Sequence, residues 1–276
     1  MKGKLYVVST PIGNLEDITL RASRILGEAD IIACEDTRVT RKLLSHLGIK
    51  KTLLSYHEHN ESEKSEEIVN ELINGKSVAV VSDAGTPCIS DPGYRVVKHA
   101  SENGIDVISI PGPCAATSAL SISGLPTSGF TFIGFLPKTA TKIKDKLQKV
   151  KYYPETLIFY ESPNRVINTL SAIQDILGNR HCSVSRELTK IYEETIRGTL
   201  SKVIEKLVEK DKIRGEFTIV VTGQNPDLLE PKIDIELELI KLKKTGKTLK
   251  EAVSIMTDRF NLQKNDVYKT ALKIWD

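Results

Sequence analysis

The first 112 residues alternate between short apolar runs and longer amphipathic segments. The runs at residues 4–9, 30–34, 77–81 and 106–109 predict strands. Amphipathic helices are predicted between them: one that Asp17 caps, one over 38–47, one over 62–73 and one from Tyr94. The run at 77–81 is apolar after its first residue, which is typical of a parallel strand buried on both faces. Repeated strand–helix units with short connections predict an N-terminal α/β domain, 1–112, with a doubly wound, mostly parallel sheet.

The chain is punctuated at Pro111-Gly112-Pro113, where we place a domain boundary. Residues 113–226 predict a second α/β domain with a mixed sheet, because residues 192–197 alternate like an antiparallel strand. The other predicted elements of this domain are a helix from Ala115, strands over 130–135, 156–160, 182–185 and 217–221, and helices over 166–177 and 200–208.

The last segment, 227–276, has a helical pattern and nearly balanced charge. Residues 248–258 and 264–274 predict two short helices joined by a tight turn. Their core is expected to consist of six apolar side chains: Leu249, Val253, Met256, Phe260, Val267 and Leu272.

A loop of twelve residues, 82–93, follows the most apolar strand and holds two Gly, two Pro and two Asp. A loop with this much backbone control is costly to order and is rarely only a connector. It lies past the carboxyl end of a parallel strand, where open α/β sheets bind ligands. We therefore expect a ligand site here, with Asp91 as an N-cap or turn residue of the next helix.

Two further loops are weaker candidates. Residues 9–15 form a strand-to-helix turn, but they lack G-x-G-x-x-G spacing, and Pro11 has no N–H for a phosphate. Residues 111–119 place small side chains at a helix start, whose free N–H groups suit a carboxylate or a cofactor. Packing of this helix against the sheet explains the small residues equally well.

The overall charge of +3 over 276 residues does not by itself indicate nucleic-acid binding. Lysines are concentrated locally, with six between residues 138 and 151 against the single acid Asp145. RNA phosphates would be attracted to this cluster in a salt-dependent way, although a solvated helix face is the alternative.

The four cysteines form no C-x-x-C pair, which predicts buried thiols in a reducing compartment. No stretch approaches the ~20 apolar residues of a membrane span. We expect a soluble, cytoplasmic protein.

Several segments, taken together and in this order, resemble the tetrapyrrole methylase superfamily: 5–19, 82–93 and 110–119. Within it, the chain is similar to the branch that methylates the ribose 2′-oxygen of a decoding-site cytidine in 16S rRNA. Further matching segments are 29–38, 56–60, 134–137, 161–163, 186–190 and 214–217, so the resemblance covers nearly the whole chain. Asn164 departs from it, since histidine is expected after Glu161-Ser-Pro.

The resemblance implies that S-adenosylmethionine binds in a cleft between the two α/β domains. The residues expected to bind it are Pro11, Ser82, Asp83, Ala84, Gly85, Pro87, Ile89, Ala115, Ala116, Tyr160, Gly215, Glu216 and Phe217.

Methyl transfer to a ribose hydroxyl depends on alignment and on a base that takes the hydroxyl proton. The acids expected to supply this base are Glu35, Asp36, Glu58 and Glu161, with His57, His59 and Glu187 nearby, and the sequence does not choose among them. Residues 57–59 offer at most two metal ligands, so no metal is expected.

The resemblance also implies 16S rRNA within the small ribosomal subunit as partner, and a homodimer. RNA contacts are expected from the lysine cluster and from three arginines that add to it: Lys138, Lys142, Lys144, Lys146, Arg38, Arg41 and Arg165. The terminal module is similar to a small helix-turn-helix, which suits RNA binding or packing. The alternatives are a methylase of a uroporphyrinogen- or precorrin-type precursor and a non-catalytic ribosome assembly factor.

Overall fold

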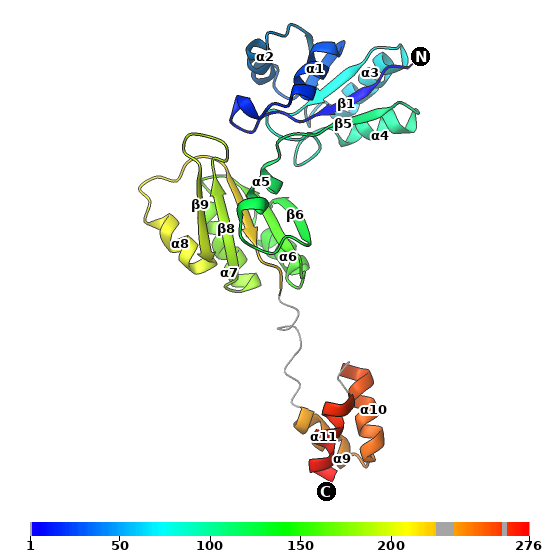
Figure 1. Cartoon of the computed structure of the whole chain (residues 1–276), viewed down its shortest axis with the longest axis vertical. Coiled ribbons are helices and arrows are strands. Elements are labelled where there is room, and N and C mark those ends of the chain that lie inside the picture. Colours follow the sequence, from blue (N-terminus) through cyan, green and yellow to red (C-terminus); the bar gives the residue numbers. More distant parts are fainter. Residues whose placement is uncertain (1, 225–234, 261–263, 276) are drawn as a thin grey trace. The chain divides into compact units, whose positions relative to one another are not determined.

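The computed structural model describes residues 2–224, 235–260 and 264–275. The chain folds into two compact units, residues 1–223 and 224–276 (Figure 1). Both β-sheets lie in the first unit, and the described part of the second unit is helical. The predicted α/β fold with C-terminal helices is confirmed.

The first sheet is parallel throughout, with the strand order β3-β2-β4-β1-β5. As its apolar sequence predicts, β4 is buried at every position. The prediction omitted β3, because a four-residue strand that is only partly buried has too little apolar pattern to stand out. The strands are β1 (Leu5–Val8), β2 (Ile31–Cys34), β3 (Thr52–Ser55), β4 (Val78–Val81) and β5 (Val107–Ile110).

Helices connect these strands and bury their apolar faces against the sheet. Thr19, not Asp17, caps the first of them by accepting a hydrogen bond from the backbone N–H of Ala22. The prediction of an Asp17 cap is wrong because Asp17 belongs to a preceding turn of 3-10 helix. The helical elements are η1 (Leu15–Asp17), α1 (Leu20–Glu28), α2 (Thr37–His46), α3 (Glu61–Ile73) and α4 (Tyr94–Glu102).

The second sheet is mixed, as predicted, with the order β6-β7-β10-β8-β9. β6 pairs parallel with β7, whereas β10 lies antiparallel between β7 and β8, and β9 is antiparallel to β8. Phe217 at the start of β10 is therefore level with Glu161 and Arg186, the last residues of β7 and β8. The strands are β6 (Phe130–Phe135), β7 (Thr156–Glu161), β8 (His181–Arg186), β9 (Glu194–Thr199) and β10 (Phe217–Val221).

Four helices belong to this half of the first unit: α5 (Ala115–Ile122), α6 (Ala140–Val150), α7 (Val166–Leu177) and α8 (Leu200–Val208). The largest apolar cluster packs α6, α7 and α8 against the sheet, with Leu147, Leu170 and Leu207 fully or almost fully buried. A smaller cluster joins α5 to Ile158 of β7 and Val220 of β10. The predicted domain boundary at residue 112 falls between β5 and α5, inside the first unit, and remains a prediction.

The second unit has three described helices, one more than predicted: α9 (Ile235–Lys244), α10 (Leu249–Phe260) and α11 (Lys264–Trp275). Val253, Met256 and Val267 are buried in its core, as expected. Leu272 is 38% exposed, so its prediction is wrong. The preceding residue, Ala271, faces the core instead. Among the described residues, no helix is long and apolar enough to cross a membrane.

Candidate active site

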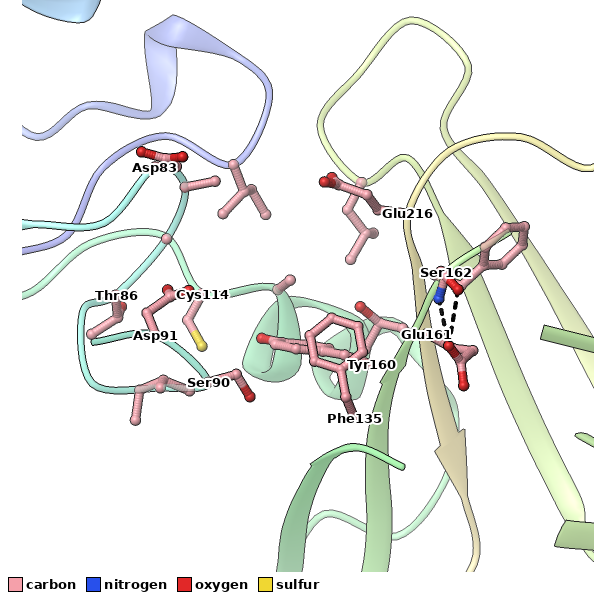
Figure 2. Close-up of a pocket in the computed structure, with 18 of the residues that line it drawn as sticks. Asp83, Thr86, Ser90, Asp91, Cys114, Phe135, Tyr160, Glu161, Ser162 and Glu216 are labelled. Carbon is pink, nitrogen blue, oxygen red and sulfur yellow. Dashed lines mark hydrogen bonds between the residues drawn. The ribbon is translucent and has the colours of Figure 1, made fainter. Parts of the chain in front are cut away.

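The first unit contains a pocket of about 470 Å³ at the carboxyl ends of parallel strands from both sheets. From the first sheet, Glu35 follows β2 and the 82–93 loop follows β4. From the second sheet, Tyr160 and Glu161 end β7. Figure 2 shows Asp83, Thr86 and Asp91 on one side of the pocket and Glu161 and Glu216 on the other. The lining residues are Ile12, Glu35, Asp83, Ala84, Gly85, Thr86, Ile89, Ser90, Asp91, Cys114, Ala115, Phe135, Tyr160, Glu161, Ser162, Pro163, Leu188, Glu216, Phe217 and Thr218.

Hydrogen bonds join the three loops that the sequence singled out. Thr10 and Gly85 exchange two backbone hydrogen bonds. The distance is 2.8 Å from the Thr10 nitrogen to the Gly85 oxygen and 3.1 Å from the Gly85 nitrogen to the Thr10 oxygen. The Thr86 hydroxyl donates to the carbonyl oxygen of Pro113, 3.1 Å away. The 9–15 loop, a weak candidate when taken alone, therefore forms one wall with the 82–93 loop.

The 82–93 loop adopts a backbone that few residues tolerate. Gly85 has φ +88°, and a Cβ there would lie 3.4 Å from Ile12. Cys88 and Ser90 also have positive φ, 71° and 66°, although neither is glycine. Backbone strain of this kind persists only where the surroundings enforce it, and it clusters at functional sites. The geometry supports the prediction that this loop is more than a connector.

Tyr160 links the second sheet to α5. Its hydroxyl oxygen accepts a hydrogen bond of 3.0 Å from the backbone N–H of Ala116. Burial raises the pKa of Tyr160, so the phenol stays protonated. One N–H group at the start of α5 is therefore satisfied within the protein and is not free for a ligand.

The pocket lining holds acidic residues but no lysine, arginine or histidine, although Arg165 and Lys190, outside the lining, pair with Glu161 and Glu216. Five acids line it: Glu35, Asp83, Asp91, Glu161 and Glu216. Burial, and then the negative charge of Glu35, raise the pKa of Asp91 to about 6, although the Ser82 hydroxyl partly opposes the shift. Burial and the charge of Asp83 also raise the pKa of Glu35. Within the described residues, Glu35, Asp83 and Asp91 form no ion pair with a basic residue, and their negative charge favours a cationic ligand.

The four acids predicted to supply a base differ in their surroundings. Glu35 and Glu161 line the pocket, whereas Asp36 and Glu58 do not. The Arg38 side chain is the main cause that lowers the pKa of Asp36 to about 2. Asp36 also caps α2, and Glu58 is exposed on the loop before α3.

The Glu161 carboxylate is already occupied. Its side chain is inaccessible to solvent, and it accepts hydrogen bonds from Ser162 at 2.8 Å and from the Thr169 hydroxyl at 2.7 Å. The Arg165 guanidinium lies 3.4 Å from the same carboxylate. These partners fix the turn after β7 and leave Glu161 little capacity to take a proton from a substrate.

Eight of the thirteen residues predicted to bind the cofactor line the pocket: Asp83, Ala84, Gly85, Ile89, Ala115, Tyr160, Glu216 and Phe217. The other five do not line it, although each is within two residues of one that does: Pro11, Ser82, Pro87, Ala116 and Gly215. Asp83 also accepts a hydrogen bond of 2.9 Å from the backbone N–H of Asp36, which ties the loop after β4 to the end of β2.

Sequence reasoning missed ten lining residues: Ile12, Thr86, Ser90, Asp91, Cys114, Phe135, Ser162, Pro163, Leu188 and Thr218. Asp91 was expected to cap a helix or hold a turn, but the N-cap of α4 is Gly93. The sequence did offer a signal for Asp91, because its carboxyl lies among the prolines and glycines of the predicted ligand loop. For Phe135 and Leu188 the only signal was the family resemblance of segments 134–137 and 186–190, because an apolar residue at or near a strand end otherwise resembles any core residue.

The predicted RNA-binding residues divide into free and engaged side chains. Lys138, Lys142, Lys144 and Lys146 are exposed at the start of α6 and along it, as is Arg41 on α2. Arg38 forms an ion pair of 2.7 Å with Asp36. Arg165 donates hydrogen bonds to the carbonyl oxygens of Leu136 and Pro137, so its guanidinium is used inside the protein.

Among the described residues, no group of three or more His, Cys, Asp and Glu is placed to hold a metal ion. The His57 and His59 rings are near each other, with centroids 6.0 Å apart. Neither lines the pocket.

Comparison with known proteins gives consistent similarities. Residues 4–204 match a family model described as Tetrapyrrole (Corrin/Porphyrin) Methylases. A Halalkalibacterium halodurans protein named ribosomal RNA small subunit methyltransferase I is 54% identical, covering 83% of this chain and 79% of its own. The Haemophilus influenzae protein of that name is 42% identical, covering 99% and 97%. The solved structure of a cobalt precorrin-4 methyltransferase has a TM-score of 0.59 at 18% identity, covering 79% of this chain and 94% of that one, and this likeness concerns the fold.

Proposed function

Because the chain belongs to the tetrapyrrole (corrin/porphyrin) methylase family, we propose that it methylates ribosomal RNA of the small subunit. The members of this family use S-adenosylmethionine, so the chain is a methyltransferase with that donor. The RNA substrate is proposed from the names of relatives that match almost the whole chain. The finer proposal, 2′-O-methylation of a decoding-site cytidine, rests on the resemblance of the motif segments to the branch that carries out this reaction.

The acidic lining of the pocket is the observation that supports it as the binding site of the methyl donor. When bound, S-adenosylmethionine supplies a methyl group on a positively charged sulfur. Five carboxylates and no basic residue line a pocket whose volume is in the range of small-molecule sites. Carboxylates stabilise a cation, whereas they would repel the phosphates of RNA. The lining thus fits the donor and leaves the RNA backbone outside.

We place the donor against eight lining residues of the predicted set, with the strained 82–93 loop as its main wall. Gly85 permits close backbone approach, since no side chain intervenes. Ser82, Pro11 and Pro87 do not line the pocket, and their proposed role is to fix the conformation of the 9–15 and 82–93 loops. The Thr10 and Ser82 contact supports this, because the Thr10 hydroxyl donates to the Ser82 carbonyl oxygen at 3.2 Å.

Glu35 and Asp91 are the proposed proton acceptors for the substrate hydroxyl. Both line the pocket, and both have a raised pKa. A base whose pKa lies near neutrality combines a useful ionised fraction with enough basicity to take a proton. Asp36 is too weak a base, Glu58 is outside the pocket, and Glu161 is engaged by its neighbours. Of the four predicted acids, Glu35 is therefore retained, and Asp91 is added.

The exposed lysines of α6 are proposed to bind the RNA backbone. Lys138 follows the pocket residue Phe135 by three positions, so the basic segment begins at the pocket edge. We further propose that the substrate is the small ribosomal subunit or its 16S rRNA in the cytoplasm and that the enzyme acts as a homodimer. These proposals rest on the family resemblance.

Methyl transfer to isolated small subunits tests the proposal directly. Subunits from cells that lack this protein are incubated with it and with S-adenosylmethionine carrying a labelled methyl group. We expect label in 16S rRNA, and mass-spectrometric mapping should place it on one ribose. Uroporphyrinogen in a parallel reaction should remain unlabelled.

Label in uroporphyrinogen but not in rRNA would assign a tetrapyrrole substrate instead. Affinity for the subunit without any methyl transfer would assign a binding or assembly role. Omitting the donor from a binding assay separates this last outcome further, because an assembly factor would bind equally well without it.

A further inference from the structure

Phe135 is a large aromatic side chain that lies open at the edge of the acidic pocket. It ends β6, lines the pocket and is 56% exposed. The next residue, Leu136, is only 2% exposed, so the strand end as a whole is not solvated. Figure 2 shows Phe135 beside Tyr160 on the side of the pocket formed by the second sheet. An apolar ring in this position is available to a ligand that enters from outside.

A β-bulge directs Phe135 toward the pocket. The register between β6 and β7 shifts between Phe132 and Gly134, and Gly134 has φ +71°. A Cβ on Gly134 would lie 3.0 Å from the Ser90 hydroxyl, so the bulge also brings β6 close to the 82–93 loop. Bulges of this kind re-aim the side chains that follow them. Without the bulge, the alternation of β6 would turn Phe135 to the opposite face.

The neighbouring aromatic rings leave more than half of Phe135 exposed. Tyr160 contacts Phe132 and Phe135 in edge-to-face geometry, with ring centroids 5.0 and 5.7 Å apart. Phe135 and Tyr160 are inclined by 64°. Because Phe135 is still 56% exposed beside this contact, part of its ring surface is accessible to a planar group. Tyr160 in turn is held through its hydrogen bond from Ala116.

Basic residues begin immediately after Phe135. Arg165 holds the carbonyl oxygens of Leu136 and Pro137 at 2.9 and 2.8 Å and so fixes the connection between Phe135 and Lys138. Along α6, Lys142, Lys146 and Lys149 are spaced by four and three residues and share one side of the helix. Within the described ranges, none of these lysines forms an ion pair, so their charges are free for phosphates.

We propose that Phe135 is a stacking platform for the base of the nucleotide whose ribose is methylated. This inference rests on the proposed function and deepens it. The lysines hold the backbone outside, the acidic pocket holds the donor, and the target nucleotide bridges the two. Enzymes that modify a nucleotide inside a folded RNA expose it by unstacking, and aromatic side chains replace the lost stacking. Stacking on Phe135 fixes the base while the ribose faces the pocket.

The test compares Phe135 with Phe130, which begins the same strand, is 46% exposed and does not line the pocket. F135L removes the ring but keeps an apolar side chain of similar size, and F135W retains a stacking surface. Methyl transfer to small subunits from cells lacking the protein is measured as kcat/KM, and S-adenosylhomocysteine affinity is measured by calorimetry. We expect F135L to lower kcat/KM about tenfold or more, the effect that base–aromatic stacking produces. F135W and F130L should stay within about threefold of the wild type, and the cofactor affinity of all variants should be unchanged.

Wild-type kcat/KM in F135L would overturn the inference. So would a loss of S-adenosylhomocysteine affinity in F135L that equals the loss of transfer, because Phe135 would then contact the donor. Loss of activity in F135W would also contradict stacking, because the site would then require the shape of phenylalanine and not an aromatic surface. Absence of transfer by the wild type would instead overturn the proposed function, and the inference with it.

Discussion

Asp91 is the residue whose chemistry differs most from its sequence-based prediction. A capping or turn role was expected because aspartate commonly caps a helix, but the N-cap of α4 is Gly93 and Asp91 lies in the pocket lining. Local sequence identified the loop but not the direction of this carboxyl, which depends on how the whole 82–93 loop bends. Gly85 was predicted to bind the cofactor, and its φ of +88° is one that only glycine readily adopts.

The raised pKa of Asp91 predicts a pH-dependent stability. An unfolded aspartate titrates near 3.8, and folded Asp91 near 6. Between these values the folded protein binds more protons than the unfolded chain, so this residue makes stability fall as pH rises from about 4 to 6. D91N removes the free-energy cost of ionising this buried carboxyl in the folded protein. We therefore expect it to raise the melting temperature by ~2–4 °C at pH 7.5.

Calorimetric melting at several pH values checks this prediction. At pH 4 the two proteins should melt within about 1 °C of each other, because Asp91 is mostly protonated in the folded wild type. S90A, a change at an exposed lining position, serves as the control and should give no pH-dependent difference. A D91N gain that is equal at pH 4 and pH 7.5 would contradict the account.

The same group should govern catalysis. If Asp91 takes the substrate proton, single-turnover methyl transfer should fall as pH is lowered through about 6. E35Q and D91N should each slow transfer by about 10²-fold or more at pH 7.5 if the altered group is the base. D36N should slow it far less, since the ionisation of Asp36 at pH about 2 lies outside this range. A flat wild-type profile from pH 5 to 8 would exclude Asp91 as the base, and unchanged transfer by E35Q would exclude Glu35.

At the scale of elements, sequence patterns located most helices and strands but not β3 or α9. β3 was missed, and β9 begins two residues later than expected because residues up to Glu193 form a turn. The bulge in β6 was also invisible, since it depends on pairing with β7 and on contact with Ser90. Features that depend on a partner strand cannot be deduced from one segment alone.

The α6 lysines make a prediction about RNA binding. K142E/K146E reverses two exposed charges one turn apart and should weaken binding of small-subunit rRNA about tenfold or more. The slope of log affinity against log salt should shrink by about 2. K202E/K206E on α8 has the same spacing and the same exposed character and serves as the matched control.

Filter binding between about 50 and 200 mM salt measures both quantities. The control pair should keep an affinity within about threefold of the wild type. An equal loss in the two double variants would mean that overall charge, not the α6 surface, governs binding. Affinity for S-adenosylhomocysteine should be unchanged in both, because neither pair lines the pocket.

At the scale of the whole molecule, the pocket is a product of both sheets of the first unit. Its lining runs from Ile12 to Thr218, and the backbone N–H of Asn14 donates to the Thr189 hydroxyl across 175 positions of sequence. Sequence reasoning reached the first-sheet loops because their composition is unusual. The opposite wall was accessible only through family resemblance, since strand order and direction decide which ends meet.

The central claim is that this pocket, walled by the Gly85 backbone, binds the methyl donor. Isothermal titration calorimetry of the full chain with S-adenosylhomocysteine measures it without a substrate RNA. The account predicts one site per chain for the wild type and at least tenfold weaker binding for G85V, because φ +88° is unfavourable for a β-branched residue. Absence of binding by the wild type, or equal binding by G85V in a protein that melts like the wild type, would contradict it.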